Sequence, residues 1–318
     1  MTPKIGVFPA SGSLAASIIN HLLRLVPASE LLLIARYPDK LAHLSRDGAT
    51  IRYADYDEPE SLNKVFDGVG VLMLVSYASF EIEHRVEAHK RAIDSAVRSN
   101  VQQIFYSSLA FGGDLATTSV AHVMGAHLAT EEYLAGLNPG YFFNYTAIRE
   151  GIYSESFPIY TAWFDPSDPT SSPNNEITIP HDGSGPGVAW AKRDELGEAT
   201  AKMIISYVKN PEGFPYVNRV VLLSGPREVS LKETVEVLGR VTGKALKIRE
   251  ISVEDYAALP QIGDRHMYHG RDLAVEWASA WEGIRRGETA VTTAVLEKWL
   301  EREPEDYETT ITKFIKGQ

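Results

Sequence analysis

Short apolar runs alternate with amphipathic stretches over the first 150 residues, and this alternation restricts the fold more than any other feature of the chain. Strands that are separated by helical crossovers form right-handed βαβ units, which build a parallel sheet with helices on both faces. We therefore expect an α/β fold with a doubly wound parallel sheet. The expected strands are 4–8, 30–36, 49–55, 70–76, 102–108 and 142–149, and the expected helices are 13–26, 58–66, 81–99 and 122–136.

The pattern changes after Arg149. A proline-rich segment at 154–187 has no sustained helical or strand period. Ser230 is the expected N-cap of a later helix, with Glu233 as its capping-box partner. The later elements that we expect are helices at 194–210 and 230–243 and strands at 219–225 and 245–252. The expected domains are a large one, 1–153 with the return of 188–222, and a smaller C-terminal α+β one, 154–187 with 223–318.

Composition limits the classes of partner. The 318 residues include 31 Lys and Arg against 42 Asp and Glu, for a net charge of −11, and no cysteine. Thiol catalysis and cysteine-ligated metals are therefore excluded, and no His-Glu-x-x-His pattern predicts a metal site. An acidic chain without a basic cluster argues against nucleic acid and anionic membranes as partners. No secretory signal or membrane-length apolar run is visible, so we expect a cytoplasmic protein, whose oligomeric state stays open.

The segment PASGSLA, which follows the first run, stands where a dinucleotide-binding loop is expected. The strict Gly-x-Gly-x-x-Gly pattern is absent, and Pro9 replaces its first glycine with a stiffer turn. Gly12 still lets a pyrophosphate approach the backbone, and the next amides open a helix toward it. The alternative is an ordinary strand–turn–helix without a ligand. The expected loop residues are Ala10, Ser11, Gly12, Ser13 and Leu14.

Polar residues also follow the other strands, at the edge where parallel sheets bind ligands. Arg36 ends the second strand, where an arginine suits the 2′-phosphate of NADP(H), and Lys40 lies one turn beyond it. We expect Asp55, with its neighbour Tyr56, on the adenine side. The ribose side is expected at Ser76 and Tyr77. Each of these positions has a plain alternative as a turn or strand-end residue. The predicted cofactor is NADP(H), and residues 1–153 are then a dinucleotide-binding domain.

These segments together resemble the NmrA-like group of atypical short-chain dehydrogenases. The matching segments are PASGSLA, ARYPDKL, ADYDEPESL, IFYSSLAF, HLATEEYL, AIREGIY, KRDELGEATA and VLEKWLEREP. HLATEEYL is most similar to the triphenylmethane reductase and quinone reductase branch. The resemblance implies a Rossmann-type domain, a small C-terminal domain and a substrate cleft between them. It also implies NADP(H) binding, with Glu150, Gly151 and Ile152 beside the nicotinamide.

Ordinary short-chain dehydrogenases use a Tyr-x-x-x-Lys pair on the helix after the fifth strand. None of the fifteen tyrosines has a lysine four residues later, and the two positions hold Val123 and His127. The usual proton donor is therefore missing, which argues against simple alcohol–ketone interconversion.

Four residues remain as catalytic candidates. Ser108, beside Ser107, ends the fifth strand, where family members place a serine near the substrate carbonyl. His127 titrates near neutrality and either bonds the ribose or relays a proton. Glu131 lies four residues later on the same helix face and fixes the tautomer of His127. Tyr153 supplies a phenolic proton or packs on the nicotinamide. Each candidate has a structural alternative. Ser108 caps a strand end, and His127 is satisfied by packing. Glu131 lies on the helix surface, and Tyr153 packs in the core.

The main hypothesis is an NADPH-dependent reductase that transfers hydride to an electrophilic acceptor: a quinone, an imine or iminium, an activated alkene or a cationic dye-like molecule. Such acceptors need little acid catalysis. An aromatic wall for a planar substrate is expected at Phe157, Tyr160, Trp163 and Phe164, whose alternative role is interdomain packing. Two other functions stay open: an NADP(H)-binding, redox-sensing regulator with a protein partner and no turnover, and a cofactor-bound isomerase of a metabolite.

Overall fold

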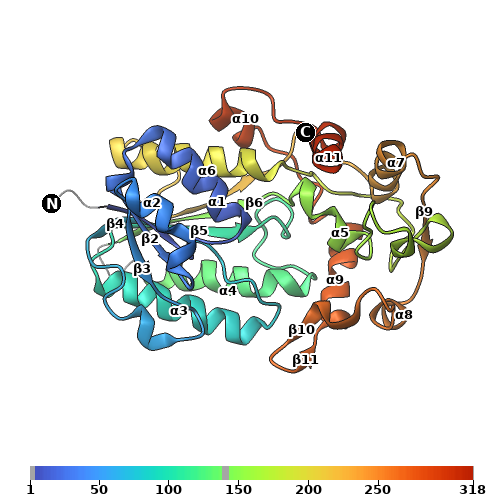
Figure 1. The fold of residues 1–318 in the computed structure, drawn as a ribbon, viewed down its shortest axis with the longest axis horizontal. Helices are drawn as coiled ribbons and strands as arrows, with labels where there is room; N and C mark the ends of the chain where they lie inside the picture. The colour runs from blue at the N-terminus through green and yellow to red at the C-terminus, as the bar shows by residue number, and fades with distance from the viewer. Residues whose placement is uncertain (1–3, 138–142, 318) are drawn as a thin grey trace.

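One parallel sheet organises the N-terminal part of the chain (Figure 1). The computed structural model describes residues 4–137 and 143–317. Among them, seven strands pair in the order β3-β2-β1-β4-β5-β6-β8, and every neighbouring pair is parallel. The order changes direction between β1 and β4, which confirms the predicted doubly wound sheet. The strands are β1 Lys4–Phe8, β2 Leu31–Ala35, β3 Thr50–Tyr53, β4 Val69–Leu74, β5 Gln103–Leu109, β6 Asn144–Glu150 and β8 Arg219–Leu223.

Two helix layers cover the sheet. Helices α1 (Ser13–Leu25) and α6 (Arg193–Lys209) lie on one face, and α3 (Ile82–Arg98) and α4 (His122–Leu137) lie on the other (Figure 1). Helix α1 carries apolar residues four positions apart, which produces a stripe along one side. It ends before Pro27, which disfavours a helical conformation in the residue preceding it.

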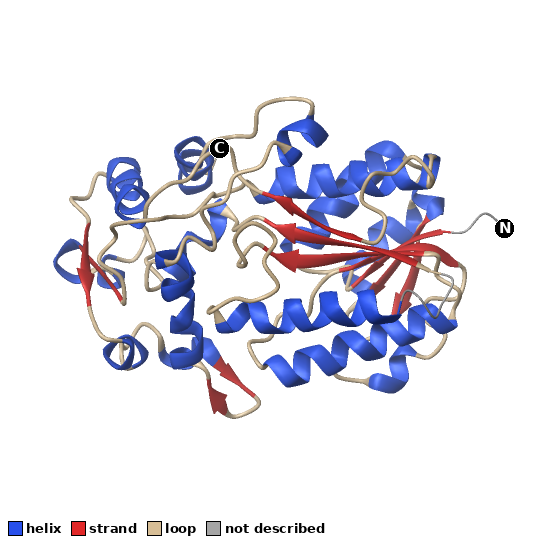
Figure 2. Cartoon of the chain, turned by 180° about the vertical axis from the view of Figure 1, so that it is seen from behind, coloured by secondary structure: helices blue, strands red, loops and turns tan. Residues whose placement is uncertain are grey.

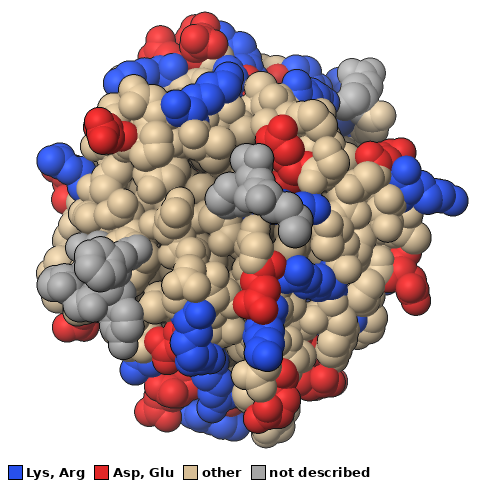
Figure 3. Space-filling view, turned by 90° about the vertical axis from the view of Figure 1, so that its left-hand side faces the viewer, with Lys and Arg blue, Asp and Glu red and all other residues tan. Residues whose placement is uncertain are grey.

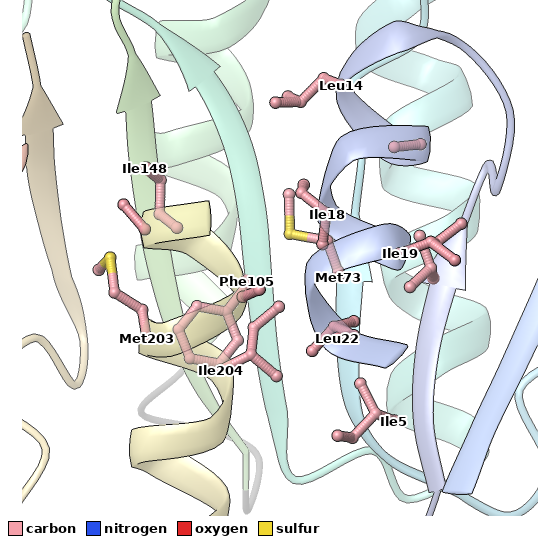
Figure 4. Packing of buried hydrophobic residues seen from close by; sticks show 14 of the residues in the cluster. Ile5, Leu14, Ile18, Ile19, Leu22, Met73, Phe105, Ile148, Met203 and Ile204 are labelled. Carbon is pink, nitrogen blue, oxygen red and sulfur yellow. The ribbon is translucent and has the colours of Figure 1, made fainter. Parts of the chain in front are cut away.

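The stripe of α1 is buried against the strands. Figure 4 shows Ile18 and Leu22 of α1 and Ile204 of α6 lying toward the strands that carry Met73 and Phe105. All five side chains are fully buried. Burial of a side chain of this size stabilises the fold by about 1.5–3 kcal/mol. This packing fixes the start of α1 relative to the ends of the strands, where the site lies.

The C-terminal residues build a second apolar cluster beyond the carboxyl ends of the strands (Figure 2). Trp190, Tyr256 and Trp281 lie at its centre and are almost completely buried. The elements around it are α5 Phe157–Tyr160, β7 Glu176–Ile179, α7 Leu231–Thr242, β9 Lys247–Glu250, α8 Val253–Ala257, the hairpin β10 Met267–Tyr268 with β11 Arg271–Asp272, α9 Ala274–Arg285 and α11 Tyr307–Lys316. Helix α10, Val295–Leu300, packs on α6 instead.

The structure differs locally from the sequence prediction at two places, the segment 58–66 and the start of α7. The helix expected at 58–66 is wrong: only a 3₁₀ turn, Pro59–Leu62, forms there, because Asn63 is extended and Lys64 has positive φ. Ser230 does cap α7 by accepting from the N–H of Glu233 at 3.1 Å. The reciprocal half of the capping box is wrong, because the Glu233 carboxylate pairs with Arg227 at 2.7 Å. Position 142, where the sixth strand was expected to begin, lies outside the described residues.

Charged side chains of both signs are mixed on the surface at the amino ends of the strands. Figure 3 shows Lys and Arg beside Asp and Glu around the rim of this face. Among the described residues, no helix is both long and apolar enough to cross a bilayer.

Candidate active site

Two hollows adjoin at the carboxyl ends of the central strands. The first, which we call the nucleotide groove, has a volume of about 620 Å³ and follows the loop after β1. The second, the inner cavity, has about 280 Å³ and lies between the ends of β4 and β5 and the C-terminal part. Both are lined by Leu14, Val75, Ser76, Ala78, Tyr153 and Ser156. The groove therefore leads into the inner cavity.

A third hollow lies at the opposite edge of the sheet. Its volume is about 680 Å³, and Lys4, Arg52 and Gln102 contribute to its lining. Although it is the largest of the three, it adjoins the amino ends of the strands. Parallel sheets bind ligands at their carboxyl ends, so we place the site in the groove and the inner cavity.

The loop after β1 fits a phosphate group. Gly12 has φ +86°, a left-handed conformation that favours glycine, and no atom lies within 4 Å of where a Cβ would stand. Helix α1 then begins at Ser13 without a side-chain cap and without an acidic residue in its first turn. The first amides of a helix have no partner within it and attract anions. Ala10 lies outside this arrangement, because it is buried and its N–H donates to the Ile34 carbonyl at 2.6 Å.

Arg36 reaches the groove already paired. Its guanidinium donates to both carboxylate oxygens of Asp55, at 2.5 and 2.7 Å, and to Asp57 at 2.8 Å. The side chain is 41% exposed, so a ligand in the groove still has access to it. The hydrogen bond to Asp55 is the main cause that raises the pKa of Arg36 above its ordinary value. Lys40 is absent from the groove lining, and its ammonium lies 4.9 Å from the centre of the Tyr37 ring.

The aromatic side of the groove consists of Tyr56 and Tyr77, whose rings lie 5.3 Å apart. Tyr56 is buried and donates its hydroxyl to the Val75 carbonyl at 2.9 Å. Tyr77 donates to the Asp57 carboxylate at 2.9 Å. The groove thus has two phenol rings, tilted by 40° to each other, beside its polar loop.

Asp57 is also part of the one group of metal-capable side chains found among the described residues. With His84 and His269 it brings three such atoms within 4.8 Å of one another. Its carboxylate already accepts from His84 at 3.0 Å, and His269 pairs with Glu81. The sequence prediction contained no metal site, and these three side chains are already paired within the protein.

Arg85 lies on the polar side of the inner cavity. It is only 7% exposed and comes from α3. Its guanidinium donates to the Ser76 hydroxyl at 2.6 and 3.2 Å, to the Ser79 carbonyl at 3.1 Å and to Nε2 of His127 at 2.8 Å. The Ser76 N–H in turn donates to the Ser107 hydroxyl at 2.9 Å. We call these five residues the Arg85 network.

His127 does line the inner cavity, but the two chemical properties predicted for it are wrong. Burial, followed by the nearby Arg85 charge, holds the pKa of His127 well below 6.5, so the ring is neutral near neutrality. A guanidinium only donates, so Nε2 accepts and the proton lies on Nδ1, 3.0 Å from the Tyr106 hydroxyl. The tautomer is therefore set by Arg85 and Tyr106, and Glu131 has no part in it.

Glu131 holds a different pair of groups. It receives two hydrogen bonds from Arg149, at 2.7 and 3.0 Å, and one from the Ser108 hydroxyl at 2.5 Å. All three side chains are buried, and Ser108 lines the inner cavity. Arg149 competes successfully for the carboxylate because a buried charge requires a partner of opposite sign. The surface alternative for Glu131 is wrong as well.

The residues after β6 divide between cavity and core. Gly151, Ile152 and Tyr153 line the inner cavity. At Gly151 a Cβ would lie 2.7 Å from the Leu223 carbonyl oxygen, which explains the glycine. Burial, followed by the charge of Glu150, raises the pKa of Tyr153 above its ordinary value.

Glu150 lines neither hollow and faces α6, where Thr200 donates to it at 2.9 Å. Its second oxygen has no partner among the described residues. Burial raises the pKa of this carboxyl to about 8.

The expected aromatic wall is mostly wrong, because three of its four residues pack elsewhere. Only Tyr160 lines the inner cavity. Phe157 and Phe164 are buried in the C-terminal cluster, and Trp163 packs against the Arg265 guanidinium. The aromatic residues that line the cavity are Phe80, Tyr153, Tyr160, Tyr268 and Trp277.

The sequence prediction omits Arg85 and His89, although both are buried beside the site. His89 accepts from the Tyr77 N–H at 2.9 Å and lies 2.9 Å from the Thr130 hydroxyl. A signal was available, because both residues share a helical stripe with Ala92 and Ala96. Charged or polar residues at i and i+4 on an otherwise apolar stripe indicate a buried polar cluster.

Comparisons with known proteins agree with this architecture. The sequence profile of the NmrA-like family matches residues 1–303. An NmrA-like family domain-containing oxidoreductase from Aspergillus flavus is 30% identical over 301 residues, which are 93% of this chain and 89% of the relative. Quinone oxidoreductase 2 from Escherichia coli is 30% identical over 254 residues, 80% of each chain.

Solved structures of similar fold include the Escherichia coli quinone oxidoreductase and a second reductase. The NADPH-dependent quinone oxidoreductase of Escherichia coli, in complex with NADPH, superimposes with a TM-score of 0.78 at 26% identity and covers 98% of this chain and 99% of its own. The triphenylmethane reductase of a Citrobacter species, in complex with NADP(H), has a TM-score of 0.76 at 25% identity, with the same coverage.

Proposed function

This chain belongs to the NmrA-like family and is an NADP-dependent oxidoreductase; we propose that it reduces an electrophilic organic acceptor, with quinones as the favoured class. NADPH supplies hydride when it is bound. The observation that carries the proposal is the continuity of the two hollows: a groove with a phosphate-binding helix start leads into an aromatic cavity.

The residues of the groove fit the cofactor from one end to the other. The free amides at the start of α1 hold the pyrophosphate beside Gly12. Arg36 supplies the hydrogen bonds for the 2′-phosphate, and Tyr56 and Tyr77 provide the flat surface on that side. The nicotinamide end then reaches Gly151 and the inner cavity. With the proposed division into one domain, 1–153 with 188–222, and a second formed by the rest, we infer that the acceptor binds between the two.

The inner cavity favours acceptors that need no proton during hydride transfer. Val123 stands where ordinary short-chain dehydrogenases have their tyrosine. His127 is neutral with its proton shared with Tyr106, and Ser108 donates to Glu131. The hydroxyl of Ser107 accepts from the Ser76 N–H, and among the described residues its own O–H has no acceptor, so it can donate to an oxygen of the substrate. Hydride transfer to a neutral quinone gives a hydroquinone monoanion, which then takes its proton from water.

The test is NADPH consumption, followed at 340 nm, with a panel of quinones, imines, activated alkenes and simple ketones. We expect turnover with uncharged quinones and little with simple ketones. A matched control replaces the exposed Glu308, far from both hollows, by alanine, and should retain the wild-type rate. NADPH binding without consumption by any panel member would contradict the proposal. It would then favour the regulator or the isomerase.

A further inference from the structure

Arg85 is a buried cation that has no carboxylate partner in the part of the chain that the structure describes. The groups that it contacts are a hydroxyl, a backbone carbonyl and a neutral imidazole, none of which carries a negative charge. Within the described ranges 4–137 and 143–317, no acidic side chain forms an ion pair with it. Burying an unpaired charge is unfavourable. The free-energy cost of burying the Arg85 guanidinium would be offset by a negatively charged group that the described residues do not provide.

The neighbouring arginine shows that pairing was possible in this part of the fold. Arg149 is equally buried, and Glu131 accepts from it twice, at 2.7 and 3.0 Å. The structural difference between the two is access, because Arg85 lines the inner cavity and Arg149 does not. The Nη1 atom of Arg85 donates one hydrogen to Ser79, and its second N–H has no partner among the residues that the structure describes.

The other titratable groups around Arg85 do not compensate its charge. Burial keeps the pKa of His89 and His127 well below 6.5. Burial also raises the pKa of Tyr106 to about 12. The same cause raises the pKa of the remaining phenols that face Arg85, which are Tyr56, Tyr153 and Tyr268. All these groups are neutral near pH 7, whereas a guanidinium stays protonated in proteins. Arg85 therefore determines the charge of the cavity.

We propose that Arg85 binds the oxygen of the acceptor that becomes negative during reduction, and that it selects neutral or anionic oxygen acceptors over cationic ones. This assignment rests on the proposed quinone reduction. Hydride from NADPH adds to the quinone and leaves NADP⁺ and a hydroquinone monoanion, whose charge lies next to the guanidinium. A proton from water then gives the neutral hydroquinone. A triphenylmethane dye, which carries a delocalised positive charge, is repelled at the same place.

Binding of a coloured phenol tests this without turnover. The probe is 4-nitrophenol, whose phenolate absorbs visible light, titrated against the NADP⁺-loaded protein over a range of pH. The wild type should bind the phenolate more tightly than the phenol and so lower the pKa of the bound probe. Arg85→Gln should lose about 10- to 100-fold in phenolate affinity, the scale of a hydrogen bond to a charged group. Its affinity for the neutral phenol should stay within about threefold of the wild type, as expected for uncharged contacts.

Two variants keep this test independent of folding. Arg85→Lys retains the charge and should keep most of the preference for phenolate. Arg240→Gln removes an exposed cation that lines neither hollow and should leave phenolate binding unchanged. Equal phenolate affinity in Arg85→Gln and the wild type would overturn the proposal. So would a loss that Arg85→Lys shares in full, or one that affects phenol and phenolate alike, because either would indicate a structural role.

A cationic probe gives the opposite sign. A triphenylmethane dye should bind Arg85→Gln at least about tenfold more tightly than the wild type, and unchanged or weaker binding would contradict the proposed selectivity. The readouts separate the two proposals. If the phenolate preference depends on Arg85 but no quinone is reduced, the anion site stands and the reductase proposal fails. If quinones are reduced and the preference is absent, the reverse holds.

Discussion

Arg36, which lines the nucleotide groove together with Arg193, and Arg85, which lines the inner cavity, have opposite surroundings. Arg36, in the groove, is 41% exposed and contacts two aspartates. Arg85, in the cavity, is 7% exposed and contacts neutral groups. Water screens the charge of the first, and its carboxylates hold it in position for a phosphate. The second acts through a charge that is neither screened nor paired. Position in the fold, more than residue type, decides what each arginine can do.

The largest expected effect lies beside the cavity, at the buried pair of Arg149 and Glu131. Glu131→Ala should lower the free energy of unfolding by about 3–5 kcal/mol, because it leaves a buried guanidinium without its partner. Urea denaturation measures this. The control is the exposed Arg240–Glu308 pair, where Glu308→Ala should cost at most about 1 kcal/mol. Similar losses of unfolding free energy in Glu131→Ala and Glu308→Ala would show that burial does not make the Arg149–Glu131 pair more important for stability than an exposed pair.

Glu150, on the other face of β6, is a buried carboxyl without a cationic partner among the described residues, and we expect it to make stability depend on pH. Its pKa is about 8 in the folded chain against an ordinary 4.5, so the native state holds a proton that the unfolded state releases. The stability linked to this group is present below pH 4.5 and is lost as the pH rises to 8. Glu150→Gln should therefore be more stable than the wild type at pH 9, by as much as about 4–5 kcal/mol. Parallel stability curves for both proteins between pH 5 and 9 would refute this.

In the groove, Arg36→Ala tests the cofactor side. The variant should bind NADPH about 1.5–3 kcal/mol more weakly, the scale of a hydrogen bond to a charged group, and leave NADH nearly unchanged. Calorimetric titration of both cofactors gives the two affinities. Equal affinity for NADPH and NADH in the wild type would contradict the assigned role of Arg36.

The smallest effect is expected at Asp57. Asp57→Asn removes one negative charge beside Arg36 and should tighten NADPH binding by about 0.5–1 kcal/mol, the range of exposed ion pairs. The gain should shrink in high salt, because the groove is open to water. A salt-independent change would indicate that Asp57 acts by holding Tyr77 and His84 in place.

The sequence predicted the sheet well because its evidence is local. Apolar runs of strand length and amphipathic crossovers define a parallel sheet, and the carboxyl ends of its strands define the edge where ligands bind. The groove could be located for the same reason: Gly12, Arg36 and Asp55 each follow a strand. The helix expected at 58–66 failed because the extended Asn63 and the positive φ of Lys64 interrupt it, and the amphipathic pattern does not reveal backbone conformation of this kind.

The inner cavity was harder to predict because its partners come from distant segments. Helical spacing correctly placed His127 and Glu131 on one side of α4. It did not reveal that Arg149, from β6, takes the carboxylate and that Arg85, from α3, takes the imidazole. The burial that makes these residues neutral or paired is a tertiary property. In the sequence, the buried polar residues beside the inner cavity are indicated only by Arg85 and His89, which lie four positions apart on the apolar stripe of α3.

The central claim is that the groove determines the specificity for the cofactor, and that the inner cavity determines the specificity for the acceptor. Initial rates over a grid of NADPH and quinone concentrations, for the wild type, Arg36→Ala and Arg85→Gln, test it most directly. Arg36→Ala should raise KM for NADPH and leave the constants for the quinone unchanged. Arg85→Gln should lower kcat/KM for the quinone and leave NADPH binding unchanged. If either variant alters both substrates to the same extent, the two regions do not act separately and the account is wrong.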